Sequence, residues 1–75
     1  MERVKLYPEA GRHYVDPQRM SRYVCLYVDS DGTAILQNVA SKWTFRAHGL
    51  GMYEDGSVDW DYSTGGHFVK ETAYD

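Results

Sequence analysis

Apolar and polar residues alternate along most of the chain with a period of two, the pattern of β-strands that expose one face to water. The runs RYVCLYV and TAILQN are rich in β-branched and aromatic residues, and they flank a polar turn at 29–32. If that turn is a four-residue loop, Val24 lies opposite Gln37, whereas a two-residue turn at 31–32 would shift the register. Both faces of this hairpin are largely apolar, so we expect it at the centre of a sheet.

The first part of the chain predicts one strand, one loop and one turn. The segment ERVKLY alternates and should form a strand that ends at Pro8, and residues 9–14 are expected to form a loop. Asp16 before Pro17 is a typical start signal for a helix. We therefore predict at most one short helical turn, near residues 17–22, which is too short to anchor a helical fold.

The second half continues the strand pattern. In KWTFRAH, alternation places Trp43, Phe45 and Ala47 toward the core and the polar side chains between them toward water. STGGH is expected to be a turn, followed by a last strand over 68–72. Residues 1–75 thus predict a single small, mainly β domain with an antiparallel sheet of about five or six strands, either an SH3-like barrel or an open meander.

The segment HGLGMYEDGSVDWDY predicts a second hairpin. The dipeptide Asp-Gly at 55–56 is typical of a two-residue type I′ turn, which needs positive φ at both central positions. Counting outward from this turn pairs Gly51 with Trp60 and Gly49 with Tyr62. Each ring could then lie across a glycine backbone and cover it.

The same register predicts a contact surface on the other face of this hairpin. It places Leu50 and Met52 outward together with Asp59 and Asp61. Exposed apolar side chains beside carboxylates are typical of a protein contact, so these four residues form the predicted partner-binding site. The alternative is that the N-terminal segment covers Leu50 and Met52, and that both aspartates form ion pairs with Lys42 and Arg46.

Composition supports a folded domain with an uneven charge distribution. Of the 75 residues, 43% are hydrophobic and 15% aromatic, too many for a disordered acidic segment. Residues 1–48 hold seven Lys or Arg and five Asp or Glu, a net +2, and residues 49–75 hold one Lys and six acids, a net −5. The two halves can pair with one another or offer docking surfaces, and the overall −3 disfavours strong nonspecific binding of nucleic acid.

The compartment is predicted from cysteine usage and hydropathy. The lone Cys25 cannot form an intramolecular disulfide, which favours a reducing environment. The first residues lack the apolar run of a signal peptide, and no window approaches the roughly 20 apolar residues of a membrane helix. We expect a soluble cytoplasmic protein with no membrane contact.

No combination of residues predicts catalysis or a cofactor. The three histidines and Cys25 are scattered without metal-ligand spacing, and DSDGT lacks the downstream carboxylate of a calcium loop. No nucleophile and base can be paired. We therefore expect a protein that is not an enzyme and has no catalytic, cofactor-binding or metal-binding residues.

These observations predict a noncatalytic interaction module that binds an unknown protein partner, or a second copy of itself through a sheet edge. One version is an acidic inhibitor that occupies a basic site on its partner. The alternative is a small nucleic-acid-binding β-barrel, because tyrosines and basic residues near one another are typical of single-strand binders. The candidates for that role are Arg19, Arg22, Tyr23, Tyr27, Lys42 and Arg46.

Overall fold

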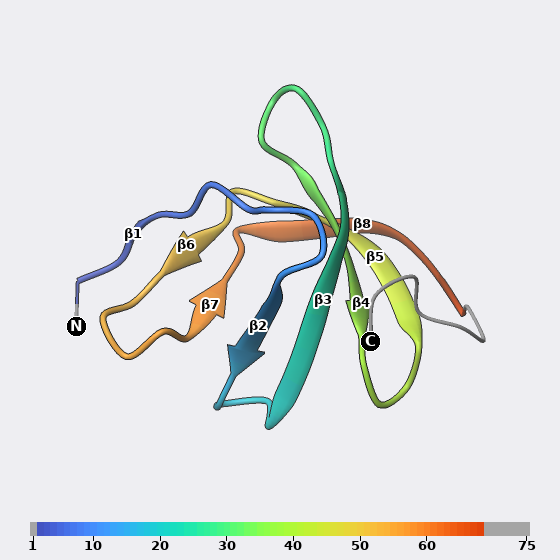
Figure 1. Cartoon of the computed structure of the whole chain (residues 1–75), viewed down its shortest axis with the longest axis horizontal. Helices are drawn as coiled ribbons and strands as arrows, with labels where there is room; N and C mark the ends of the chain where they lie inside the picture. The colour runs from blue at the N-terminus through green and yellow to red at the C-terminus, as the bar shows by residue number, and fades with distance from the viewer. Residues whose placement is uncertain (1, 69–75) are drawn as a thin grey trace.

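The computed structural model of the chain describes residues 2–68, which are all β. The strands form two antiparallel sheets, one of five strands and one of three, that do not close into a barrel (Figure 1). The predicted small antiparallel β fold is confirmed in its open form and not as an SH3-like barrel, with eight strands in two sheets among the described residues where about five or six in one sheet were expected. The strands are β1 (Val4–Lys5), β2 (His13–Asp16), β3 (Ser21–Val28), β4 (Ala34–Asn38), β5 (Trp43–His48), β6 (Gly51–Met52), β7 (Val58–Asp59) and β8 (Tyr62–Phe68).

The first hairpin, β3 and β4, lies inside the five-stranded sheet, whose order is β2-β3-β4-β5-β8. The predicted pairing of Val24 with Gln37 is confirmed. Toward the loop the register shifts, because Leu26 is an extra residue on β3 and Tyr27 pairs with Ile35. Such a bulge adds one residue to one strand and changes the face of every residue beyond it.

Strand β2 corrects the expectation of a loop over residues 9–14, since its first half lies within that segment. Tyr14 pairs with Tyr23 on β3, and both side chains are buried. Burial of this aromatic pair explains why the chain is extended here. The short helical turn expected near residues 17–22 is a non-helical turn at 17–20, where the Met20 N–H donates to the Pro17 carbonyl at 3.2 Å, and residues 21–22 already belong to β3.

The turn between β6 and β7 has three residues rather than the predicted two. The Tyr53 N–H donates to the Ser57 carbonyl at 2.9 Å, and the Gly56 N–H donates back to the Tyr53 carbonyl at 2.9 Å. Gly56 has a φ of +87°, a backbone angle that residues with a side chain rarely adopt. This combination is a type I turn followed by a left-handed glycine, the usual three-residue hairpin loop.

The longer loop moves the hairpin register by one residue. Gly51 pairs with Asp59 and Met52 with Val58, so the predicted pairing of Gly51 with Trp60 is wrong. Because side chains alternate with a period of two, this single step exchanges the faces of β6 relative to β7. The residues expected outward at 50 and 52 therefore lie on the core side with Val58.

Strand β5 follows the predicted alternation only in part. Phe45 and Ala47 are buried as expected, but Trp43 is 49% exposed and Thr44 is buried instead. The Trp43 ring lies over Gly66, where an added Cβ would meet a ring carbon at 2.7 Å. The expected packing of an aromatic ring over a glycine thus occurs in this protein, but it joins β5 and β8 and not the two strands of the hairpin at 48–62.

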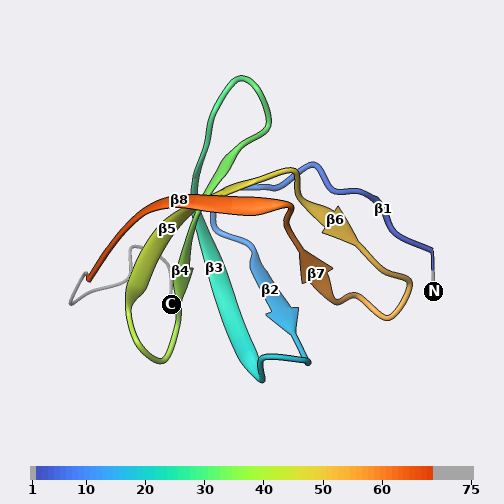
Figure 2. The same ribbon diagram turned by 180° about the vertical axis from the view of Figure 1, so that it is seen from behind.

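Strand β8 runs through the segment expected to be a turn. It pairs with β5, with a register shift opposite Phe45 at Gly65 and Gly66 (Figure 2). Both glycines have a positive φ, which lets the backbone form this irregularity within β8, so the strand continues instead of ending in a turn. The part of the predicted 68–72 strand beyond Phe68 lies outside the described residues.

The core draws on both sheets. Leu36, Val24 and Cys25 are fully buried, and Trp60 packs on the core from the β7–β8 connection. Burial raises the pKa of the Cys25 thiol, although its bond to the Tyr27 carbonyl opposes this. The cluster of buried residues is Tyr14, Tyr23, Cys25, Ala34, Leu36, Phe45, Ala47, Leu50 and Val58.

Candidate binding groove

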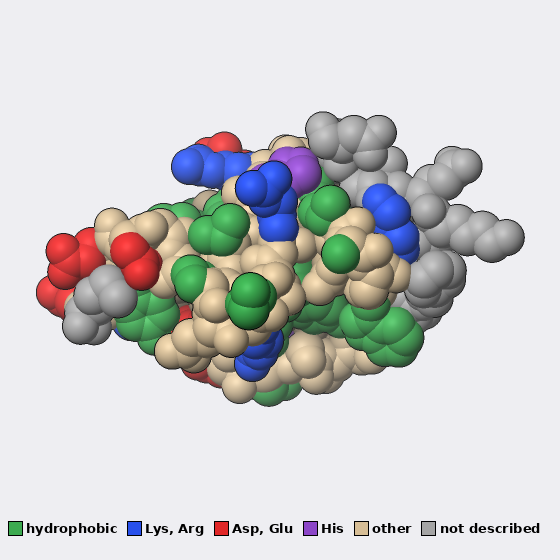
Figure 3. Space-filling view, turned by 90° about the horizontal axis from the view of Figure 1, so that it is seen from below, with side chains coloured by type: hydrophobic (Ala, Val, Ile, Leu, Met, Phe, Trp, Pro, Cys, Tyr) green, Lys and Arg blue, Asp and Glu red, His purple; other side chains and the backbone are tan. Residues whose placement is uncertain are grey.

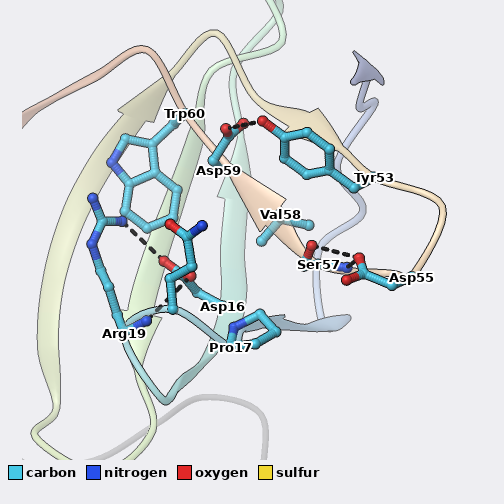
Figure 4. A pocket seen from close by; sticks show the side chains of 10 residues that line it. Asp16, Pro17, Arg19, Tyr53, Asp55, Ser57, Val58, Asp59 and Trp60 are labelled. Atoms are coloured by element: carbon cyan, nitrogen blue, oxygen red, sulfur yellow. Dashed lines mark hydrogen bonds and ion pairs between the residues drawn. The ribbon is translucent and has the colours of Figure 1, made fainter. Parts of the chain in front are cut away.

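A groove of about 460 Å³ lies where β2 and its turn meet the β6–β7 hairpin (Figure 4). The two segments are adjacent because Val15 forms an isolated parallel bridge with Ser57. One wall is formed by residues 16–19, and the other by residues 57–60 with two side chains of the hairpin turn, Tyr53 and Asp55. Residues about 40 positions apart in the sequence thus border one hollow.

Trp60 connects the groove to the core. Its ring packs against Tyr23 at 5.3 Å and Phe45 at 5.0 Å between centroids. On the groove side, the guanidinium carbon of Arg19 lies 5.1 Å from the Trp60 ring centroid. The ring is therefore held by core contacts and presents a surface on which a cation already lies.

The base of the turn holds a buried carboxylate. The Asp16 side chain is 9% exposed and accepts a hydrogen bond from Arg19 Nη1 at 3.0 Å. Its other oxygen accepts the Arg19 backbone N–H at 3.4 Å, as an N-cap residue does. Asp16 thus orders the turn and places negative charge beside Trp60.

The opposite wall holds a second carboxylate with its own partners. Asp59 accepts hydrogen bonds from Arg3 Nε at 2.6 Å and from the Tyr53 hydroxyl at 2.8 Å. Burial opposes ionisation of Asp59, but these hydrogen bonds and the charge of Arg3 outweigh it and hold its pKa below 3.8. The same contacts raise the pKa of Arg3 and of Tyr53. Asp59 is therefore a fixed anion at neutral pH.

The two glycines before this wall leave space for that ion pair. A Cβ on Gly51 would meet Arg3 Cζ at 2.5 Å, and one on Gly49 would meet Asp61 Cγ at 2.7 Å. Arg3 Nη2 also donates to the Gly49 carbonyl at 2.5 Å. The glycines therefore admit a charged cluster rather than aromatic rings. The predicted pairing of Gly49 with Tyr62 is wrong, and that ring stacks on His48 at 4.4 Å with an exposed fraction of 59%.

The structure separates the four predicted partner-binding residues. Leu50 is 4% exposed and lies in the core, so the expectation that it is exposed is wrong. Met52 is half-buried and packs against the core, Asp59 lines the groove, and Asp61 is exposed and contacts Arg3 but does not line the groove. Their role in binding a partner stays a prediction.

The alternative arrangement of these residues agrees with the structure in one respect. The N-terminal segment lies beside the hairpin, since β1 pairs with β6 and the Leu6 N–H donates to the Leu50 carbonyl at 3.0 Å. The two aspartates pair with Arg3 rather than with the expected Lys42 and Arg46. Arg46 instead forms an ion pair with Asp29.

The candidates for nucleic-acid binding are dispersed over the molecule. Tyr23 is 5% exposed and belongs to the core, whereas Tyr27 is 57% exposed. Arg19 lies in the groove, and Arg46 is engaged by Asp29. The described residues therefore offer no single surface on which Tyr23 and Tyr27 could both stack bases.

The sequence does not predict that Asp16, Arg19, Tyr53 and Trp60 border one groove, although it offers Arg19 as a candidate for binding nucleic acid. Asp16 was identified only as a turn signal. The available signal for Trp60 was its spacing from Val58, because residues two apart on a strand share a face. Val58 is buried at 2% exposure, so Trp60 points in the same direction.

Comparisons with known proteins found no match among protein-family models, curated proteins or solved structures. Within the described part of the chain, no helix exists that could cross a membrane. Among these same residues, no group of three His, Cys, Asp or Glu side chains is placed to hold a metal ion. The function is therefore inferred from the geometry of the groove.

Proposed function

We propose that this domain is a noncatalytic protein-interaction module whose groove receives a segment of a partner protein. The observation that carries the proposal is the position of Trp60, which is anchored in the core and borders a hollow between Asp16 and Asp59. A rigid aromatic residue beside fixed hydrogen-bond acceptors is the composition of an interface hot spot.

Charge indicates which kind of partner surface fits. Figure 3 shows acidic side chains gathered at the end of the molecule formed by β1 and the β6–β7 hairpin. A basic partner surface would be drawn to this end, so the acidic-inhibitor version remains part of the proposal. We place the protein in the cytoplasm, because its one cysteine is suited to a reducing compartment.

The test is selection of ligands from a display library of random and proteome-derived peptides, followed by mapping with amide chemical shifts. Ligands that shift residues 16–19 and 57–60 support the proposal. Asp59→Asn should weaken their binding by about threefold or more, because it removes a charged acceptor from the groove. Asp61→Asn is the matched control, since Asp61 carries the same charge and also contacts Arg3 but does not line the groove.

Two results would contradict the proposal. Equal loss of binding in both variants would mean that overall charge, not the groove, holds the ligand. Tight binding of an oligonucleotide that weakens steeply with salt, with no groove ligand selected, would favour the nucleic-acid alternative. Light scattering completes the test, because a strict monomer removes the version in which the module binds a second copy of itself.

A further inference from the structure

We propose that the groove recognises an arginine side chain of the partner segment, and that Arg19 occupies the place of this arginine in the unbound domain. The inference rests on the proposed function and names the chemistry of the partner. Its basis is the surroundings of Arg19, which already resemble those of a bound ligand.

The Arg19 guanidinium lies between an aromatic ring and a carboxylate. Its carbon is 5.1 Å from the Trp60 ring centroid, and its Nη1 donates to Asp16 Oδ2 at 3.0 Å (Figure 4). A planar guanidinium suits both contacts at once, since its face stacks on the ring and its edge donates to carboxylate oxygens. The site therefore selects a guanidinium by shape as well as by charge.

The two members of this ion pair differ in burial. The Asp16 side chain is 9% exposed, whereas the Arg19 side chain is 60% exposed. A carboxylate buried so far needs a cation beside it, but a cation so exposed is held weakly. Arg19 can thus leave at small cost, provided that another cation replaces it.

The remainder of the groove supports a cationic occupant. Asp55 and Asp59 stand on the wall opposite Asp16, and Arg19 is the one cation among the residues that line the groove. The lining thus carries three carboxylates against a single guanidinium. Asp59 already pairs with Arg3, so a partner arginine that replaces Arg19 would keep Asp16 paired and would also be attracted by Asp55.

The experiment uses a blocked peptide of sequence Gly-Ser-Arg-Ser-Gly with its citrulline and lysine analogues. Citrulline keeps the planar shape of arginine without its charge. Binding is followed through the indole N–H signal of Trp60 in the whole domain. Arg19→Ala should bind the arginine peptide about three- to tenfold more tightly than the wild type, because the site is vacated. Arg22→Ala, the matched loss of an exposed arginine outside the groove, should bind as the wild type does.

The controls separate recognition from general attraction of charge. The citrulline peptide should not bind, and the lysine peptide should bind Arg19→Ala more weakly than the arginine peptide. Adding Asp16→Asn to Arg19→Ala should abolish the gain. The double variant must be shown to be folded by its amide spectrum.

The outcomes distinguish this inference from the proposed function. Equal affinity of the wild type and Arg19→Ala for the arginine peptide would overturn the inference. Selected ligands that bind the groove without an arginine would also overturn it and leave the proposed function standing. Absence of any groove ligand would overturn both.

Discussion

Replacing Gly51 with alanine tests whether this glycine makes room for Arg3. The added Cβ would lie 2.5 Å from Arg3 Cζ, so the arginine must move away. Arg3 would then lose its bonds to Asp59 at 2.6 Å and to the Gly49 carbonyl at 2.5 Å. Because the Arg3 and Asp59 side chains are 35% and 39% exposed, we take this loss as about 1–2 kcal/mol, below the value for a buried charged pair.

Gly51→Ala also has an effect that stabilises the fold. Gly51 does not have a positive φ, so alanine fits its backbone and stabilises the fold by about 0.4–1 kcal/mol through the unfolded state. Gly51→Ala alone should therefore cost between about 0 and 1.6 kcal/mol, and after Arg3→Ala it should stabilise. The coupling free energy in this double-mutant cycle should be about 1–2 kcal/mol.

Urea unfolding followed by tryptophan fluorescence measures the cycle, and about 1 kcal/mol corresponds to a shift of about 4–8 °C in Tm. Gly56→Ala is the control. Its φ of +87° makes alanine costly, but nothing lies within 4 Å of the added Cβ, so its cost should not depend on Arg3. The reasoning is refuted if Gly51→Ala has the same cost with and without Arg3.

Three further predictions concern stability and reactivity. As the pH falls through 3.8, the unfolded chain takes up a proton before folded Asp59 does, so the free energy of unfolding should fall. Asp59→Asn should reduce that slope in acid titrations of stability, and an unchanged slope would contradict the role of Arg3 as its partner. Leu36→Ala should cost about 2–5 kcal/mol in urea unfolding, because Leu36 is fully buried, and a cost below about 1 kcal/mol would contradict that burial. The Cys25 thiol is buried and its pKa is raised, so a disulfide reagent at pH 8 should label it only as fast as the protein opens. Immediate labelling of the folded protein would disagree with this.

Local alternation was sufficient to predict the central hairpin. Two apolar runs around a polar turn predict the pairing of β3 with β4, and the four-residue turn gives the observed pairing of Val24 with Gln37. Because both faces are largely apolar, alternation alone leaves the register of a two-residue turn open. The alternation of apolar and polar residues does not predict the bulge at Leu26. The bulge accompanies a three-residue loop at 30–32, where the Asp29 N–H donates to the Thr33 carbonyl, instead of the four-residue loop considered from the sequence. The Cys25 backbone also forms hydrogen bonds with residues 11 and 12, which are contacts between distant segments.

The second hairpin shows how a turn signal can fix the wrong register. An Asp-Gly pair suits a two-residue turn, but glycine also suits the last position of a three-residue loop. The side chains themselves distinguish the two, because the longer loop places Leu50, Met52, Val58 and Trp60 on one face. Weighting this apolar match above the turn signal would have given the observed register.

The groove was the least predictable feature. The turn after Asp16 was evident from the sequence, but its contact with the hairpin depends on the parallel bridge between Val15 and Ser57. Pairing across some 40 residues leaves no local pattern, and the position of Trp60 follows only when the register is correct. The sequence identifies Asp59 as a candidate, although for a surface shared with Leu50 and Met52, which lie on the core side.

The most direct test of this account is the set of nuclear Overhauser contacts made by the Trp60 indole. The account predicts cross-peaks from its ring protons to Tyr23 and Phe45, and to the side chain of Arg19. A cross-peak to the Hα protons of Gly51, shifted upfield by a ring lying above them, would contradict the hairpin register and with it the groove.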